Sequence, residues 1–393
     1  MTRRLAALDA WLLAWPRAGR CAAVALTIAV MIALSLPKVP RPFVDYASLP
    51  LLRHVSQPAT YGTDTIADVY ESRVVVNDVF DMYTKAKVEQ TPLEAQTWSK
   101  AASAPYPPAV LLAEAGLAAV GDRLGIGLYG MVLLLAIIFV GLSLWYCLRT
   151  RWYVFPLLYL NFVYFSERFV FVQDGSYLVM LVAVMAALLL ARAGRGLCHA
   201  LVAVAITMKL SPLAYAMNLP KMTRRHAAIF IAILVAGLVL PYFVWDNYLY
   251  IYSFNDGIKG RWYSSIVAAA IAVPFAYALW RVQERRGFDL EDRIGWGLVP
   301  FALFLGWKMN VARHLLIVLL VPDKRGLRSA CAAIGLALPV LLPGLVRFNS
   351  ALPITTVLLM AVLAWYWRTP DPNVSGRPQG ATPTRPATVE SGI

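Results

Sequence analysis

Four basic side chains interrupt two long apolar stretches of the chain, and their positions point most directly to chemistry. They are Lys209 in the stretch 197–219, and Lys308, Arg313 and His314 in the stretch 295–322. On insertion scales a charge at the centre of a membrane costs about 2.5–3.5 kcal/mol, so ionisable groups in such stretches indicate function. Cations without neighbouring acids suit an anionic ligand such as a phosphate. For Lys308 the simpler interpretation is a side chain that extends to the membrane surface.

Carboxylates that could act as a base are concentrated in the polar segment 38–125. Asp64 and Asp68 lie four residues apart there, so they share one face if this part of the segment is helical. The simple interpretation is two hydrated loop acids, but Tyr70 and the aromatic, apolar context favour a functional role. A carboxylate close to a bound phosphate can take the proton of an attacking hydroxyl, so either aspartate is a candidate general base.

The composition indicates that most of the chain lies in a membrane. Of its 393 residues 60% are hydrophobic and 15% charged, and the mean hydropathy is +0.62. Soluble domains have about 25% charged and 45–50% apolar residues, so a soluble enzyme is excluded. The net charge of +14 would suggest nucleic acid in a soluble protein, but in a membrane protein basic residues set topology and contact lipid headgroups. We therefore expect membrane lipids as partners, and no nucleic acid.

The elements that must position these residues are membrane helices. A hydrocarbon core of about 30 Å needs roughly 20 apolar residues per helix. Eight runs fit this requirement: 21–37, 126–147, 152–171, 175–192, 227–245, 263–281, 327–345 and 351–368. The two interrupted stretches add pairs of shorter helices. The sequence thus predicts an all-α polytopic membrane protein with about eight full spans and two broken or re-entrant helix pairs, up to about 12 membrane segments.

Basic residues indicate the topology of these segments. They are clustered at 3–20, 149–151, 192–195, 221–225, 281–293, 324–328 and in the tail from Arg368. The positive-inside rule places these clusters in the cytoplasm, so both termini are cytoplasmic and 38–125 faces outward. Each interrupted stretch then begins and ends on the cytoplasmic side and must turn back within the membrane. Because broken backbone at membrane depth needs protein or water around it, we expect a cavity there.

We expect one membrane domain, 1–368, followed by a disordered cytoplasmic tail, 369–393. Within the domain, 38–125 is a long outer loop with juxtamembrane helices. The four histidines and four cysteines lack ligand spacing, and no phosphate-binding glycine loop is present. We therefore expect no cofactor, although outer-loop carboxylates could hold a divalent metal.

Several short motifs carry a resemblance to a known family. They are Asp81-Met-Tyr83, Ala104-Pro-Tyr106-Pro-Pro108, Gln173-Asp-Gly-Ser176, Met208-Lys209-Leu-Ser-Pro212 and Trp307-Lys-Met-Asn-Val-Ala-Arg313-His314. In this order, after a first span and an acidic outer loop, the chain resembles GT-C glycosyltransferases, and more closely glycosyltransferase family 87, the polyprenyl-phosphate-mannose-dependent type. The Gly-Gln pair of that family is not intact here, and its Trp/His turn is stretched.

The resemblance implies a sugar transfer at the outer face of the bacterial plasma (inner) membrane. A polyprenyl-phosphate donor, mannose-like in its sugar, would pass the sugar to a lipid or glycan hydroxyl with inversion. The donor phosphate would be held by Lys209, Arg313, His314 and Lys308, and the base would be Asp64 or Asp68. We expect four further residues to line the substrate cavity: Tyr70, Tyr106, Arg168 and Gln173.

Two other classes of protein remain open at this point. A polytopic transporter or lipid flippase for an anionic substrate would also use broken helices with buried cations. The long outer loop and the lack of evident repeat symmetry argue against it. A non-catalytic scaffold of the cell envelope would leave the buried cations unexplained. An aspartate at the mouth of the cavity that contains Lys209 would favour the enzyme.

Overall fold

The computed structural model describes residues 2–35, 108–156, 175–208, 211–240, 243, 262–286 and 288–298, with isolated positions at 361, 364, 365 and 368. These residues form helices and turns and include no strand, so the all-α prediction is confirmed for this part of the chain. None of the helices in the described ranges combines the length and the apolar character that a membrane crossing requires. The expected tail, 369–393, and most of the expected outer loop lie outside the described residues.

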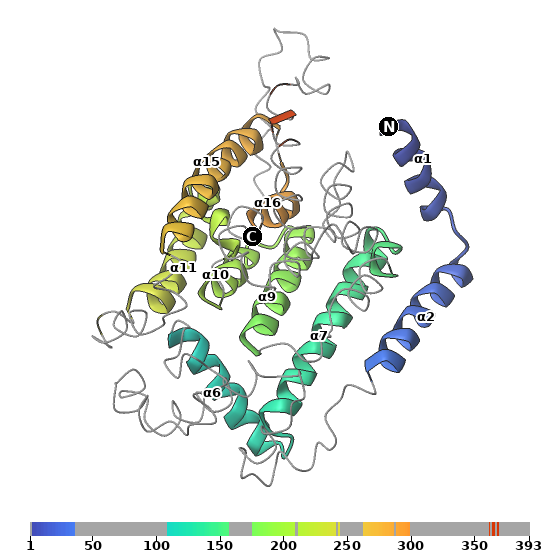
Figure 1. Ribbon diagram of the computed structural model, residues 1–393, viewed down its shortest axis with the longest axis horizontal. Coiled ribbons are helices and arrows are strands. Elements are labelled where there is room, and N and C mark those ends of the chain that lie inside the picture. Colours follow the sequence, from blue (N-terminus) through green and yellow to red (C-terminus); the bar gives the residue numbers. More distant parts are fainter. Residues whose placement is uncertain are drawn as a thin grey trace, which may run out of the picture.

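Four predicted apolar runs form helices close to the expected boundaries. They are α2 (Arg17–Ser35), α7 (Gly127–Arg149), α9 (Gly175–Arg192) and α15 (Trp262–Arg286). Leucine and alanine are frequent in α7 and α9, which favours helix, and each ends on an arginine that complements the negative end of the helix dipole. Figure 1 shows α7 and α9 side by side, and α9 lies between α7 and α10.

Two helices fall outside the predicted runs. The first, α1 (Thr2–Leu13), precedes α2 and is separated from it by the turn around Pro16. The second, α6 (Pro108–Arg123), lies within the predicted outer loop and starts with a proline, which is well tolerated at the first helical position. It packs against α7 and buries Val110 completely. The sequence analysis treated 108–123 as part of the polar outer segment, whereas the structure shows it as an apolar helix packed against α7.

The stretch 197–219 is divided beside Lys209, as the sequence predicted. The first half of the stretch is α10 (Cys198–Met208), and the second half is the 3-10 helix η3 (Ser211–Lys221). Pro212 cannot donate a backbone hydrogen bond and disfavours α-helical backbone in the residue before it, which accounts for the break. The next predicted run, 227–245, is represented by α11 (Arg224–Leu234) and the π-helical turn η4 (Val235–Val239).

A short helix, α16 (Leu290–Gly297), follows α15 and covers the beginning of the second interrupted stretch. Its N-cap is Asp289, whose carboxylate accepts a hydrogen bond of 2.8 Å from the backbone N–H of Asp292. Acids in its first turn complement the positive end of the helix dipole. The remainder of this stretch, and the predicted runs 327–345 and 351–368, lie outside the described residues apart from the isolated positions.

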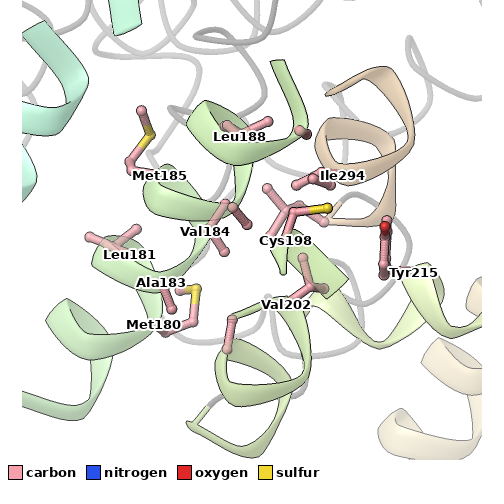
Figure 2. Packing of buried hydrophobic residues seen from close by; sticks show 14 of the residues in the cluster. Met180, Leu181, Ala183, Val184, Met185, Leu188, Cys198, Val202, Tyr215 and Ile294 are labelled. Atoms are coloured by element: carbon pink, nitrogen blue, oxygen red, sulfur yellow. The ribbon is translucent and has the colours of Figure 1, made fainter. Parts of the chain in front are cut away.

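The core is built around α9, which is buried on most of its circumference. Figure 2 shows Val184 of α9 pointing toward Cys198 of α10, with Ile294 of α16 beside Cys198, while Leu181 and Met185 lie on the other side of α9. The fully buried side chains of this core include Leu178, Met180, Val184, Met185, Leu188 and Cys198. A helix that is apolar all round is stable only in such a buried position. The core thus fixes α10, and with it the start of the broken pair.

Candidate functional site

Every residue that the sequence analysis selected for the site lies outside the described residues. They are Asp64, Asp68, Tyr70, Tyr106, Arg168, Gln173, Lys209, Lys308, Arg313 and His314. The structure therefore neither brings these residues together nor separates them. It does describe the chain on both sides of Lys209, because α10 ends at Met208 and η3 begins at Ser211. The candidate site is accordingly built from the broken pair α10–η3 and the elements that hold it.

The residues on either side of the break are buried. Met208 is 7% exposed and Thr207 is 4% exposed, and Pro212 is buried as well. The Thr207 hydroxyl donates a hydrogen bond of 2.8 Å to the Val204 carbonyl, so its polar group is satisfied within α10. Met208 before Lys209 in the sequence and Pro212 after it are therefore both buried apolar residues.

The π-helical turn η4 packs directly against the end of α10. Gly237 is buried, and a Cβ atom at this position would come within 2.8 Å of Thr207 Cβ and still closer to Thr207 Cγ2. Only glycine allows this approach of backbone to a β-branched side chain. Single π-helical turns occur frequently at functional sites. The sequence analysis did not identify Gly237, because an isolated glycine in an apolar run gives no specific signal.

The two ends of the broken pair meet each other. His199, at the start of α10, shares a hydrogen bond of 2.8 Å between its Nδ1 atom and the Tyr215 hydroxyl of η3. Its ring centroid lies 5.5 Å from that of His226, in the first turn of α11. The His226 ring also covers Gly196, where a Cβ atom would overlap the ring. These contacts hold the start of α10 against η3 and the first turn of α11; the predicted return of the stretch to one side of a membrane stays a prediction.

The helix η3 is held from the other side by α16 and α15. Arg293 donates hydrogen bonds of 3.3 Å to Asn218 Oδ1 and of 2.8 Å to the Phe288 carbonyl, and Asn218 is 3% exposed. Lys221, at the end of η3, forms an ion pair with Glu284 of α15. Because these contacts connect three elements, they fix the position of η3 relative to the core.

A second polar group joins the ends of α7, α9 and α16. The Glu291 carboxylate accepts hydrogen bonds from the Tyr146 hydroxyl at 3.2 Å and from Arg192 Nη1 at 3.5 Å. Arg192 also donates through Nη2 to the Arg149 carbonyl at 3.0 Å, and so caps the end of α7. Burial raises the pKa of the Glu291 carboxyl above its ordinary value of 4.5, and the neighbouring Arg192 charge opposes that shift. The carboxylate is therefore a structural link whose charged form is disfavoured by burial.

We call the end of the bundle that carries these contacts the basic end, defined by Arg149, Arg192, Lys221 and Arg293. It joins four of the predicted cytoplasmic clusters: 149–151, 192–195, 221–225 and 281–293. The cluster 3–20 reaches it through Trp15, whose ring lies 5.5 Å from that of Trp152. In the described residues, members of these four clusters therefore lie close together at one end of the bundle. On which side of a membrane this end lies stays a prediction.

The charged groups that define the basic end are paired with other protein groups. Among the described residues no three histidines, cysteines or acids are placed to hold a metal ion. His199 and His226 are neighbours that the sequence analysis treated as scattered, and their separation along the chain gave no signal of a pair. The structure therefore describes the helices before and after Lys209 in the sequence, α10 and η3, while the expected catalytic acids remain predictions.

Comparisons of the chain with protein-family models, with curated proteins and with solved structures found no match. The likeness to glycosyltransferase family 87 therefore rests on the short motifs in the sequence.

Proposed function

We propose that the protein is an integral-membrane glycosyltransferase of the GT-C type. It transfers a mannose-like sugar from a polyprenyl-phosphate donor to a lipid or glycan hydroxyl at the outer face of a bacterial inner membrane. The order of the motifs supports this proposal, and so does the chemistry of a buried cation in a broken helix. No nucleotide sugar is required outside the cell, which fits the lack of a phosphate-binding glycine loop.

The exposed face of α7 supports a location in the bilayer. Leu134, Ile138, Trp145 and Leu148 follow one another along this face, and they are 40%, 39%, 51% and 56% exposed. Soluble proteins rarely expose a continuous apolar surface of this kind, whereas lipid chains would cover it. The face ends at the basic end, where the Arg149 guanidinium lies 4.9 Å from the centre of the Trp145 ring. Tryptophan and arginine at the end of an apolar helix are typical of a membrane surface.

The observation that carries the proposal is the break between α10 and η3. Lys209 falls in this break, the residues on both sides are buried, and the pair returns to the basic end. A lysine that must remain charged in an apolar environment is stabilised by a phosphate more strongly than by water-exposed partners. The lipid phosphate of the donor is a partner that can reach it laterally from the bilayer.

The proposed reaction is a single displacement at the anomeric carbon. The acceptor hydroxyl attacks this carbon, the bond from carbon to the phosphate oxygen breaks, and polyprenyl phosphate leaves with the bond electrons. Asp64 or Asp68 takes the hydroxyl proton, which contributes roughly 10²–10⁴-fold to the rate. Lys209, Arg313 and His314 stabilise the negative charge that develops on the leaving phosphate.

The test is sugar transfer by the full chain in liposomes. The probe is radiolabelled polyprenyl-phosphate mannose, and a bacterial membrane lipid extract supplies the acceptor. We expect labelled product with the wild-type chain, and loss of product with Asp64→Asn or Asp68→Asn while donor binding persists. Asp9→Asn, which removes an acid in α1, is the matched control and should keep full turnover.

Two results would contradict the proposal. Near-normal turnover in both aspartate variants would show that the base lies elsewhere. Movement of labelled donor between the leaflets without any sugar transfer would support the transporter or flippase instead, since a transferase does not need to move its donor across the bilayer.

A further inference from the structure

The N-terminal helix α1 is attached to the bundle at one end. The Trp152 indole donates a hydrogen bond of 2.9 Å to the Leu12 carbonyl, and the Trp15 ring lies 5.5 Å from the Trp152 ring. Figure 1 shows α1 and α2 at the edge of the molecule, beyond α7. Because Trp152 comes shortly after the end of α7, this contact places the last turn of α1 at the basic end.

α1 is a separate rod and not the beginning of α2. The chain turns at Pro16, and the Arg20 guanidinium donates to the carbonyls of Trp15 and Leu13. These bonds satisfy carbonyl groups that the end of a helix leaves without partners. With 12 residues α1 is about 18 Å long, which is too short to cross a hydrocarbon core of about 30 Å.

The surface of α1 is apolar where it does not contact the bundle. Leu8 is 51% exposed and Trp11 is 57% exposed, three positions apart and therefore on one face of the helix. The Trp11 ring meets the Trp15 ring edge-on at 5.4 Å, so this face continues into the contact with Trp152. An exposed tryptophan beside an exposed leucine on a short helix is typical of a helix that lies in a membrane surface.

Basic residues outnumber acids in α1 and the turn after it, with Arg3, Arg4 and Arg17 against Asp9. Arg3 and Arg4 are in the first turn of α1, which contains no acid, and Arg17 is exposed at the start of α2. Cations in the first turn oppose the helix dipole, so they do not stabilise α1 by themselves. Their positive charge is stabilised when an anion lies near the first turn. Anionic phospholipid headgroups supply that charge at the same surface into which Leu8 and Trp11 would insert.

We propose that α1 lies flat on the bilayer at the basic end, and that it binds anionic phospholipids through its arginines while Leu8 and Trp11 insert between the lipids. This inference rests on the proposed membrane location and does not depend on sugar transfer. Trp15 and Trp152 fix the C-terminal end of α1, so the lipid contact sets the direction in which the first predicted span leaves the surface.

The test is hydrogen exchange of residues 2–13 in the full chain. The chain is placed in nanodiscs of phosphatidylcholine alone, or of phosphatidylcholine mixed with phosphatidylglycerol. We expect exchange in α1 to be about 25-fold slower with the anionic lipid, because Arg3 and Arg4 near an anionic surface each contribute about a fivefold gain. Arg3→Gln together with Arg4→Gln should remove most of this difference, and Trp11→Ala should speed exchange in both kinds of disc.

The matched control is Arg195→Gln, which removes an exposed cation at the basic end outside α1 and should leave the lipid effect unchanged. Equal exchange in both kinds of disc would overturn the inference and leave the membrane location standing. Protection that follows the number of protein copies per disc, and not the lipid charge, would also overturn it, because the face would then bind a second copy. A chain that does not enter nanodiscs would overturn the membrane location and this inference together.

Discussion

The imidazole rings of His199 and His226 lie with their centroids 5.5 Å apart, although the whole broken pair α10–η3 separates them along the chain. His199 also shares a hydrogen bond with the Tyr215 hydroxyl, which connects α10 to η3. These two contacts hold the start of α10 against η3 and against the first turn of α11.

The cations proposed to hold the donor phosphate lead to a prediction for ligand binding. Lys209→Met and Arg313→Met should each weaken binding of a polyprenyl-phosphate sugar by roughly 1.5–3 kcal/mol, the range for a hydrogen bond to a charged group. Equilibrium binding of a fluorescent donor analogue to the purified variants measures the effect. Arg225→Met, which removes an exposed cation of α11, is the control. If both variants bind the donor as tightly as the wild type, these cations do not hold its phosphate.

The close approach of η4 to α10 predicts a sharp effect of one methyl group. Gly237→Ala places a Cβ atom inside van der Waals contact with Thr207 and should lower the free energy of unfolding by about 1–3 kcal/mol. Thermal unfolding of the full chain measures this loss. Gly141→Ala in α7, where nothing lies within 4 Å, should be neutral or slightly stabilising.

A second substitution tests the cause of that loss. Thr207→Ala removes the nearest atom and should restore part of the stability of the Gly237→Ala chain. A Gly237→Ala chain as stable as the wild type would show that η4 and α10 do not pack as closely as the structure has them.

The contact between α16 and η3 predicts coupled substitutions. Arg293→Met leaves the buried Asn218 Oδ1 without its donor, at a cost of about 1–3 kcal/mol of unfolding free energy. Asn218→Leu should then add less in the Arg293→Met background than in the wild type, because the two groups form one interaction. Unfolding in denaturant across the four chains gives the coupling. Strictly additive losses would mean that the two side chains act independently.

The buried Glu291 carboxyl predicts a dependence of stability on pH. Burial raises its pKa in the folded chain, so the contribution of this group to stability is complete below the unfolded value of about 4.5 and is lost as the pH rises through the folded value. Glu291→Gln keeps acceptor and shape but does not titrate. The melting temperature of the wild type should therefore fall relative to that of the variant as the pH rises above about 4.5.

Tyr146→Phe sharpens this test, because it removes the hydroxyl that donates to the charged carboxylate. The fall in melting temperature with pH should be larger in that variant than in the wild type. A wild-type chain whose melting temperature rises over this range, relative to Glu291→Gln, would contradict the sign of the shift.

The distribution of basic residues predicts the topology of the whole chain. Ser99→Cys lies in the segment 38–125, which should face outward, so a membrane-impermeant thiol reagent should label it in intact cells. The wild-type chain under the same reagent controls for the native cysteines, of which Cys147 and Cys198 are buried. Labelling that requires permeabilised cells would reverse the orientation and remove the reason to place the proposed site outside.

Apolar length and a single proline made much of the described fold predictable. The runs 126–147 and 175–192 correspond to α7 and α9 within two residues, and Pro212 marks the break after α10. These features depend on local chemistry, which a sequence displays directly. The predicted return of the broken pair to one side of a membrane followed from charge alone and stays a prediction.

Contacts between distant residues were not predictable. The bond between Arg293 and Asn218 and the packing of Gly237 on Thr207 join positions that share no periodic pattern. Amphipathic spacing also gave no warning of α6, because its apolar residues follow a long polar segment. The catalytic aspartates and the phosphate-binding cations were selected by residue type and motif. They lie outside the described residues and remain predictions.

The indole of Trp152 bonds to a carbonyl that was made 140 residues earlier, in Leu12. Ribosomes add about 5–20 residues per second, so α1 exists for roughly 7–28 s before its partner has been synthesised. During this interval its exposed Leu8 and Trp11 have no protein surface at the basic end to meet. If α1 binds lipid as proposed, the order of synthesis makes the lipid surface available to the N-terminus before the bundle.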